Sequence, residues 1–344
     1  MASRAGRATL AQIASAAGVS VSTVSKVVNG RPDVAADTRA LVQQVLDELA
    51  YEPRRVDGPR APVVALLFHG PLMTYSLEIL EGVLGAASDV DVDLVVARTD
   101  IAGLAQQRIQ ERAVADWQAV IAVTSAASEL AALSRAGVPT VVIDPMGVPR
   151  RDVISVGSTN FAGGLTATQH LIDLGHRRIA HLGGTPGAAC SQARLQGYRG
   201  AMEAAGLRVP KGFTRDGDFT YDTGLEQGAA LLDASDPPTA IFAANDEMAL
   251  GVLEAARTRG LRVPEDLSIV GFDDTEVARV ASPQLTTVAQ PLRRMGMAAL
   301  RTAMRLGAGE RVESHHVELA TELVVRGSTA PPAGLVDEAR SLTA

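Results

Sequence analysis

Residues 21–29 predict a helix with an apolar side and a polar side that is built for hydrogen bonding. The polar side carries hydroxyls, one cation and one amide: Ser22, Thr23, Ser25, Lys26 and Asn29. Such side chains touch base edges in the DNA major groove and hold phosphates. The alternative is a small helical bundle with a hydrated polar face. Residues 1–31 contain four basic residues and no acid, a formal charge of +4, whereas the whole chain carries −7. A basic patch on an acidic chain favours the DNA interpretation.

Two short helices joined by a tight turn, followed by a longer third helix, are predicted over residues 9–51. Thr9 and Ser20 stand at the N-caps of the first two helices. Gly18 supplies the left-handed residue that ends the first helix. Apolar residues at helical spacing turn one side of each helix inward: Leu10, Ile13, Ala14 and Ala17, then Val24, Val27 and Val28. The pattern predicts a helix-turn-helix.

A second group of polar residues follows apolar runs or a glycine-rich loop further along the chain. Its members are Asp144, Arg194, Asn245, Asp246, Asp273 and Asp274. Carboxylates and amides exchange hydrogen bonds with sugar hydroxyls, and the arginine fork bridges a hydroxyl pair. An aspartate after a strand is as often an N-cap as a ligand, but several at corresponding strand ends indicate a shared site. Phe219 either offers its ring face to a sugar or packs in a core.

After Arg60, short and continuous apolar runs alternate with helical stretches. The runs are Val63–Phe68, Leu94–Ala97, Val120–Val123, Thr140–Ile143, Arg178–Leu182, Thr239–Ala244 and Leu267–Gly271. Continuous apolar strands separated by helices are typical of parallel sheets covered on both faces. Two such series predict two doubly wound α/β lobes. Ligands in this architecture bind beyond the carboxyl ends of the strands, here in a cleft between the lobes.

From residue 9 to about residue 329 the chain resembles the LacI/GalR family of bacterial transcription repressors. The headpiece motifs are Thr9-Leu10, Ile13-Ala14, Ala17-Gly18-Val19-Ser20, Thr23-Val24-Ser25, Val28-Asn29-Gly30, Thr38-Arg39 and Tyr51-x-Pro53. The core motifs are Leu174-Gly175-His176-Arg177-Arg178-Ile179, Asn245-Asp246-x-Met248-Ala249-Leu250-Gly251, Val270-Gly271-Phe272-Asp273-Asp274 and Pro283-x-Leu285-Thr286-Thr287-Val288-x-Gln290-Pro291. The resemblance implies a helix-turn-helix headpiece followed by a two-lobed periplasmic-binding-protein-like core.

The same resemblance implies a homodimeric repressor of a sugar-utilisation operon that a small sugar releases from, or modulates on, a palindromic operator. Relatives also use nucleobases and phosphoprotein co-repressors as effectors. The candidate DNA-binding residues are Thr9, Ser20, Val21, Ser22, Thr23, Ser25, Lys26, Asn29, Arg31, Arg54 and Arg55. The candidate effector-binding residues are Tyr75, Asp144, Arg194, Phe219, Asn245, Asp273, Gln290 and Leu292.

We expect a headpiece over residues 1–51, a linker over 52–61, a core over 62–329 and a disordered tail over 330–344. Within the core, the first lobe takes about 62–159 plus 290–319 and the second lobe about 160–289 plus 320–329. The tail has no leucine heptads, which favours a dimer over a tetramer.

The linker departs from the family pattern. Relatives carry a hinge helix there whose leucine wedges into the minor groove. Here the segment is shorter, lacks leucine and is broken by Gly58-Pro59 and Pro62. We expect little intercalation; the alternative is that Arg54 and Arg55 keep phosphate contacts and Val56 acts as a weak wedge.

Several classes of protein are disfavoured by what the sequence lacks. No signal peptide opens the chain, no apolar run approaches ~18 residues, and Cys190 is the only cysteine. We therefore expect a cytoplasmic, soluble protein. The histidines lack metal-ligand spacing, so neither a metal nor a cofactor is expected. A plain sugar-binding protein is disfavoured by the basic headpiece, and a sugar-processing enzyme by the lack of an acid/base pair.

Overall fold

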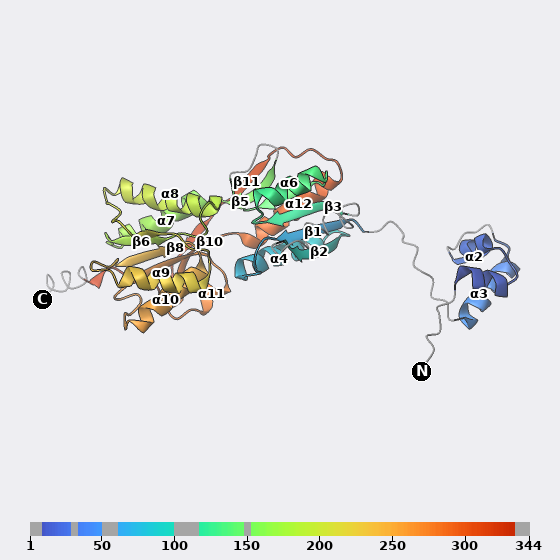
Figure 1. The fold of residues 1–344 in the computed structure, drawn as a ribbon, viewed down its shortest axis with the longest axis horizontal. Coiled ribbons are helices and arrows are strands. Elements are labelled where there is room, and N and C mark those ends of the chain that lie inside the picture. The colour runs from blue at the N-terminus through green and yellow to red at the C-terminus, as the bar shows by residue number, and fades with distance from the viewer. Residues whose placement is uncertain (1–8, 29–33, 50–60, 100–116, 148–152, 334–344) are drawn as a thin grey trace. The chain divides into compact units, whose positions relative to one another are not determined.

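The computed structural model describes residues 9–28, 34–49, 61–99, 117–147 and 153–333. The chain divides into two compact units, Met1–Arg60 and Ala61–Ala344, which are treated separately below. Figure 1 shows the helices of the first unit and the two sheets of the second. No helix in the described part is both long enough and apolar enough to cross a membrane.

The first unit contains three helices whose ends follow the expected caps. They are α1 (Leu10–Ala16), α2 (Val21–Val28) and α3 (Ala36–Glu48). Thr9 accepts a hydrogen bond from the Gln12 backbone at 3.3 Å, and Gln12 Oε1 accepts one from Thr9 N at 2.8 Å. Ser20 Oγ accepts one from Thr23 N at 3.1 Å. Gly18 has a φ of +64°, a left-handed conformation that glycine adopts without strain.

The apolar sides of these helices form one small core. Its buried members are Ile13, Ala14, Ala17, Val24, Val27, Val42, Val45 and Leu46. Leu10 and Val28 pack against it partly buried, so the predicted inward faces of α1 and α2 are confirmed. Burying these valines turns the opposite side of α2 outward, where Ser22 and Lys26 are exposed.

The first lobe of the second unit is a parallel six-stranded sheet with the order β11-β5-β4-β3-β1-β2. Its strands are β1 (Val63–Phe68), β2 (Asp93–Arg98), β3 (Trp117–Val123), β4 (Thr140–Ile143), β5 (Ile154–Ser158) and β11 (His316–Leu319). Helices α4 (Thr74–Ala87) and α12 (Leu292–Gly307) cover one face of the sheet, toward which Val64 and Leu66 of β1 point. Helix α6 (Ala127–Arg135) covers Ala65 and Leu67 on the other face.

The second lobe is a six-stranded sheet with the order β12-β10-β9-β8-β6-β7. Its strands are β6 (Ile179–Leu182), β7 (Thr214–Arg215), β8 (Ala240–Ala243), β9 (Ser268–Asp273), β10 (Thr286–Ala289) and β12 (Glu322–Val324). All neighbours are parallel except β12, which runs antiparallel to β10. Its helices are α7 (Asn160–Asp173), α8 (Ala189–Ala204), α9 (Tyr221–Leu232), α10 (Asp246–Thr258) and α11 (Glu276–Val280). Alternate residues of β8 face opposite cores: Phe242 lies in the core that includes residues of α7 and α8, and Ile241 in the core that includes α10.

The chain passes between the lobes three times, after β5, after β10 and after β11. Two passages are tied together, because the hydroxyls of Thr159 and Thr321 lie 3.0 Å apart and Thr321 N donates to Thr159 Oγ1 at 3.0 Å. The predicted doubly wound α/β architecture is confirmed by the two sheets (Figure 1). The predicted linker up to residue 60, and the tail from residue 334, lie outside the described residues.

Candidate functional site

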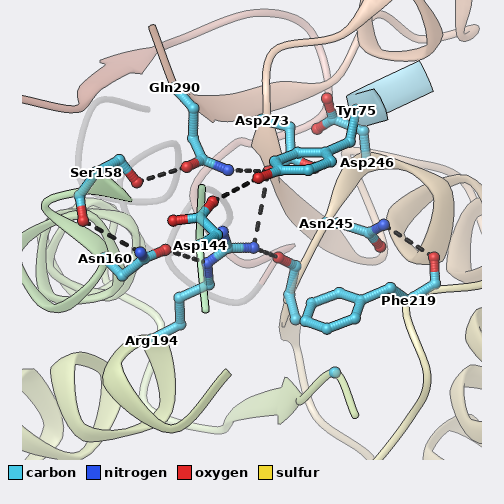
Figure 2. Close-up of polar contacts among 12 residues, drawn as sticks. Tyr75, Asp144, Ser158, Asn160, Arg194, Phe219, Asn245, Asp246, Asp273 and Gln290 are labelled. Carbon is cyan, nitrogen blue, oxygen red and sulfur yellow. Dashed lines mark hydrogen bonds and ion pairs between the residues drawn. The ribbon is translucent and has the colours of Figure 1, made fainter. Parts of the chain in front are cut away.

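Polar side chains from both lobes meet where the strands of the two sheets end at their carboxyl ends (Figure 2). Asp144 follows β4, Asp273 is the last residue of β9, and Asn245 follows β8. We call the group the interlobe cluster, and it consists of Tyr75, Asp144, Ser158, Asn160, Arg194, Asn245, Glu247, Asp273 and Gln290. The site therefore lies where ligands bind in open parallel sheets.

Arg194, from α8, is the buried cation of the cluster. It is 3 % exposed, donates from Nε to Asn160 Oδ1 at 2.8 Å and from Nη1 to the Ala244 carbonyl at 2.5 Å. Nη1 also lies 3.7 Å from Asp273 Oδ1. The guanidinium carbon stands 3.7 Å above the centre of the Phe272 ring, a cation–π arrangement. These contacts fix the plane of the fork.

Asp144 faces Arg194 from the first lobe. Tyr75, in the first turn of α4, donates its hydroxyl to Asp144 Oδ2 at 2.6 Å. Burial raises the pKa of Asp144 above its ordinary value, and burial together with the neighbouring Asp144 raises the pKa of Tyr75 well above 10. Tyr75 therefore acts as a neutral donor toward this carboxyl group.

Gln290 connects the cluster to the passages between the lobes. Its Nε2 donates to Asp273 Oδ1 at 2.6 Å, and its Oε1 accepts from Ser158 Oγ at 2.5 Å. Gln290 is 7 % exposed and Asp273 is 3 % exposed. Burial raises the pKa of Asp273 well above its ordinary value. Both ends of the Gln290 amide are thus engaged by the protein.

Asn245 and Glu247 bring the start of α10 into the cluster. Asn245 caps α10 by accepting from Met248 N at 3.0 Å. Its Nδ2 donates to the Phe219 carbonyl at 2.9 Å and to Glu247 Oε2 at 3.0 Å. Thr74 of α4 donates its hydroxyl to Glu247, so this carboxylate joins the two lobes.

Backbone strain is concentrated at the same place. The non-glycine residues with positive φ in the described part are Thr124, Asp144, Phe219, Asp273 and Asp274. Four of them follow or end strands β3, β4 and β9, and Phe219 lies after β7. Non-glycine residues adopt this conformation at a free-energy cost, and such residues gather at functional sites. The strain supports the assignment of a site to these strand ends.

Two predicted effector residues lie differently from the others. Phe219 is half-buried, packs against the second-lobe core, and its ring sits so close to Gly184 that a Cβ there would lie 2.0 Å from it. Leu292 is 4 % exposed in the first-lobe core. Both assignments to the effector pocket stay predictions. The remaining six all take part in the hydrogen-bonded cluster described above.

Sequence reasoning missed four members of this neighbourhood: Thr74, Ser158, Asn160 and Glu247. Glu247 had a signal, because it stands two residues after Asn245 in a helix start. The others are ordinary polar residues whose proximity depends on the chain crossing between lobes. Asp246, which had been noted after its strand, is fully buried and accepts from Thr275 and Thr287, so its carboxylate braces the second lobe.

On the headpiece, the DNA-binding candidates among the described residues lie on α2 or directly before it, except Thr9, which precedes α1. Val21 is 48 % exposed, and Ser22 and Lys26 are exposed beside it. Ser20 Oγ lies 2.9 Å from both Ser22 Oγ and Thr23 Oγ1. Thr9 uses its side chain in the α1 capping box, and Ser25 is half-buried. The candidates outside the described residues are Asn29, Arg31, Arg54 and Arg55.

The described residues support neither a metal site nor a reactive thiol. No three histidine, cysteine or acidic side chains there are grouped so as to hold a metal ion. Burial raises the pKa of the Cys190 thiol to about 11, which keeps it protonated and a poor nucleophile.

A helix-turn-helix unit joined to a two-lobed core with a buried polar cluster defines a DNA-binding regulator with a ligand-binding core. Residues 9–54 match the model of bacterial regulatory proteins of the lacI family, and residues 168–329 match the periplasmic binding protein-like domain. The regulator CelR of Thermobifida fusca is 37% identical over 341 residues, covering 94% of this chain and 99% of CelR. The chain belongs to the LacI family of bacterial transcription regulators, so the predicted class, a regulator and not an enzyme, is confirmed.

Solved structures agree with this assignment. A CelR–cellobiose complex has a TM-score of 0.73 at 37% identity, covering 94% of this chain and 100% of that one. A lac repressor dimer bound to operator and an anti-inducer has a TM-score of 0.76 at 28% identity, with the same coverage. The predicted two-lobed fold and the headpiece are both matched by these relatives.

Proposed function

We propose that this protein is a homodimeric repressor that binds a pseudo-palindromic operator through α2 and responds to a small sugar bound at the interlobe cluster. The headpiece takes residues 1–51 and the effector-binding core residues 62–329. It acts in the cytoplasm, where bacterial operator DNA lies.

The observation that carries the sugar proposal is the pairing of Arg194 with Asp273 beside Asp144. Arginine, carboxyl and amide groups held at fixed geometry exchange hydrogen bonds with adjacent hydroxyls. The three side chains are 3 %, 3 % and 7 % exposed, and their positions are set by bonds to Asn160, Gln290 and Tyr75. The related CelR is known in complex with cellobiose.

The DNA proposal rests on the outer side of α2. Val21, Ser22 and Lys26 face bases in this proposal, and Thr23, Ser25 and Asn29 hold the backbone. Short side chains let a helix approach the groove floor closely, while lysine neutralises phosphates or reads guanine. The lac repressor, a structural relative, is known as a dimer bound to operator.

The dimer proposal is supported by apolar side chains on the outer surface of the first lobe. Leu77 and Leu84 are seven residues apart on α4 and are 48 % and 46 % exposed. Val95 and Val96 are 41 % and 44 % exposed on β2, an edge strand of the sheet. Exposed apolar side chains such as these, on a helix and on an edge strand of one lobe, are typical of subunit contacts.

Two experiments test the proposal together. The full chain is mixed with DNA from upstream of its neighbouring genes in a gel-shift assay, and with a sugar library in a thermal-shift screen. We expect a discrete shifted complex and at least one sugar that raises the melting temperature, since a ligand at 100 times its Kd adds about 2.7 kcal/mol. A chain that shifts no DNA would contradict the operator-binding part of the proposal. A sugar that binds without any shifted DNA would support a plain binding protein.

A further inference from the structure

The interlobe cluster holds far more acidic than basic side chains. Asp144, Glu247 and Asp273 of the cluster, and Asp246 next to Glu247, are each 7 % exposed or less. Arg194 is the one buried lysine or arginine among the described residues. The four carboxyl groups are bonded mainly to neutral donors, which are the side chains of Tyr75, Thr287, Thr74 and Gln290. These donors are uncharged, so they bring no positive charge that an anionic ligand could use.

Arg194 uses two of its five N–H donors within the protein, so the side chain is held in place and its remaining N–H groups can bind hydroxyls. Arg194 already donates to Asn160 and to the Ala244 carbonyl, and it lies 3.7 Å from Asp273. Phosphate recognition usually relies on a bidentate arginine or on several cations. The described part of the cluster offers this one guanidinium and no second buried cation.

The helix N-termini of this region, where an anion could bind, already contact groups of the protein. A helix N-terminus attracts anions through its free N–H groups and its dipole. The start of α10 is capped by Asn245 and carries Asp246 and Glu247 in its first turn. At the start of α8, Ala189 N donates to the Met146 carbonyl at 3.0 Å.

We propose that the interlobe cluster accepts an uncharged, hydroxyl-rich ligand and rejects sugar phosphates and sugar acids, with Glu247 as a specificity-determining residue. The inference rests on the proposed sugar-responsive function and names the class of sugar. An anion entering the cluster would lose its hydration and meet several carboxyl groups and a single guanidinium, which weakens its binding. A neutral sugar instead donates its hydroxyls to them.

Glu247 is the informative position because its charge can be removed while its contacts are kept. In Glu247→Gln the amide oxygen still accepts from Asn245, and the amide nitrogen donates to the Thr74 hydroxyl, which can accept. Asp246 is unsuitable because both of its oxygens are engaged inside the lobe. Glu203, an exposed acid on α8, provides the matched control in Glu203→Gln.

The test is calorimetric titration of the full chain with matched pairs: cellobiose, glucose and ribose, each against its terminal phosphate ester. We expect a neutral sugar to bind about tenfold or more tightly than its phosphate, because like charges in an interface are strongly unfavourable. Glu247→Gln should reduce the ratio of neutral-sugar affinity to phosphate-ester affinity by about threefold or more. Glu203→Gln should leave this ratio unchanged.

A phosphate ester that binds as tightly as its neutral partner would overturn the inference while leaving the sugar-responsive function standing. An equal ratio in the Glu247 and Glu203 variants would overturn the role of Glu247. If no neutral probe bound although operator DNA was bound, the sugar effector itself would be contradicted, and the DNA-binding role would remain.

Discussion

Gln290 donates a 2.6 Å hydrogen bond to Asp273, and this bond connects the candidate effector site to a segment that passes between the lobes. The other end of the same amide accepts from Ser158, at the end of β5 in the first lobe. A ligand that contacts Asp273 would therefore act on both lobes through one side chain. This arrangement gives the site a physical route to a change in lobe orientation.

Replacing Gln290 with leucine should damage both stability and effector response. The variant leaves Asp273 and Ser158 buried without these partners, and an unsatisfied buried polar group costs about 1–3 kcal/mol. Urea denaturation should show that loss, and titration should show weaker sugar binding. Gln196→Leu, at an exposed position on α8, is the control and should change neither quantity. Equal behaviour of the two variants would contradict the role of Gln290.

Arg194→Ala should abolish the effector response and leave operator binding intact, because the core and headpiece are separate units. Each lost charge-assisted hydrogen bond costs about 1.5–3 kcal/mol, which is more than tenfold in affinity. Calorimetry measures the sugar affinity, and a gel shift measures DNA binding. Arg199→Ala removes an exposed arginine of the same helix and serves as the control. Unchanged sugar affinity in Arg194→Ala would reject the assignment.

The contribution of Asp246 to the stability of the chain should fall as the pH rises from about 4 to about 7. Burial raises the pKa of Asp246 to about 7 from an ordinary value of 3.8. Between these values the folded chain keeps a proton that the unfolded chain has released, so Asp246 favours folding most at low pH. The slope is at most about 1.4 kcal/mol per pH unit for one proton. Asp144 and Asp273, whose pKa burial also raises, act in the same direction. His181, whose pKa burial lowers to about 3, acts in the opposite direction, so the contribution of Asp246 is measured by comparing variants.

Denaturation of the unmodified chain and of Asp246→Asn at several pH values measures this contribution. The asparagine can still accept from Thr275 and donate to the Thr287 hydroxyl, so the variant should fold and show a smaller slope. Asp236→Asn, at an exposed acid, should keep the full slope. Equal slopes in the unmodified chain and in Asp246→Asn would show that Asp246 is not the titrating group.

Much of this fold could be predicted because local patterns and tertiary packing agree. The apolar runs of β1, β4 and β8 are continuous, and their structural bounds differ from the predicted ones by no more than a residue at either end. β5 and β10 were not predicted as strands. β5, Ile154–Ser158, interrupts its apolar residues with serine and glycine, and β10 begins with two buried threonines. Their placement depends on pairing with strands far away in the chain.

The residues of the candidate site could also be predicted only in part. Asp144, Asn245 and Asp273 were identified because each follows a recognisable strand. Asn160 and Ser158 were missed because nothing nearby in sequence distinguishes them, and their contacts join residues 34 and 132 positions apart. The Thr74–Glu247 bond joins residues 173 positions apart and depends on the relative placement of two lobes. Local patterns carry no information on such distances.

The linker should bend DNA only modestly. Residues 52–60 contain no leucine and are broken by Gly58-Pro59, so a helix there is limited to roughly one turn. Arg54 and Arg55 would then engage phosphates or a narrow minor groove without unstacking bases. A circular-permutation gel shift measures the bend. A sharp central kink of the size that wedge-inserting proteins produce would show this prediction to be wrong.

The central claim is that one chain binds an operator through α2 and changes that binding when a neutral sugar occupies the interlobe cluster. Fluorescence anisotropy with labelled operator, with and without the sugar found by thermal shift, tests it most directly. We predict strongly salt-dependent binding to a pseudo-palindrome, altered about tenfold or more by the sugar. Lys26→Ala should weaken operator binding. If Lys26 reads a base, the discrimination against other bases at that position should fall by about 1–3 kcal/mol. Equal affinity for operator and random duplex, or an operator affinity unaffected by the bound sugar, would contradict the account.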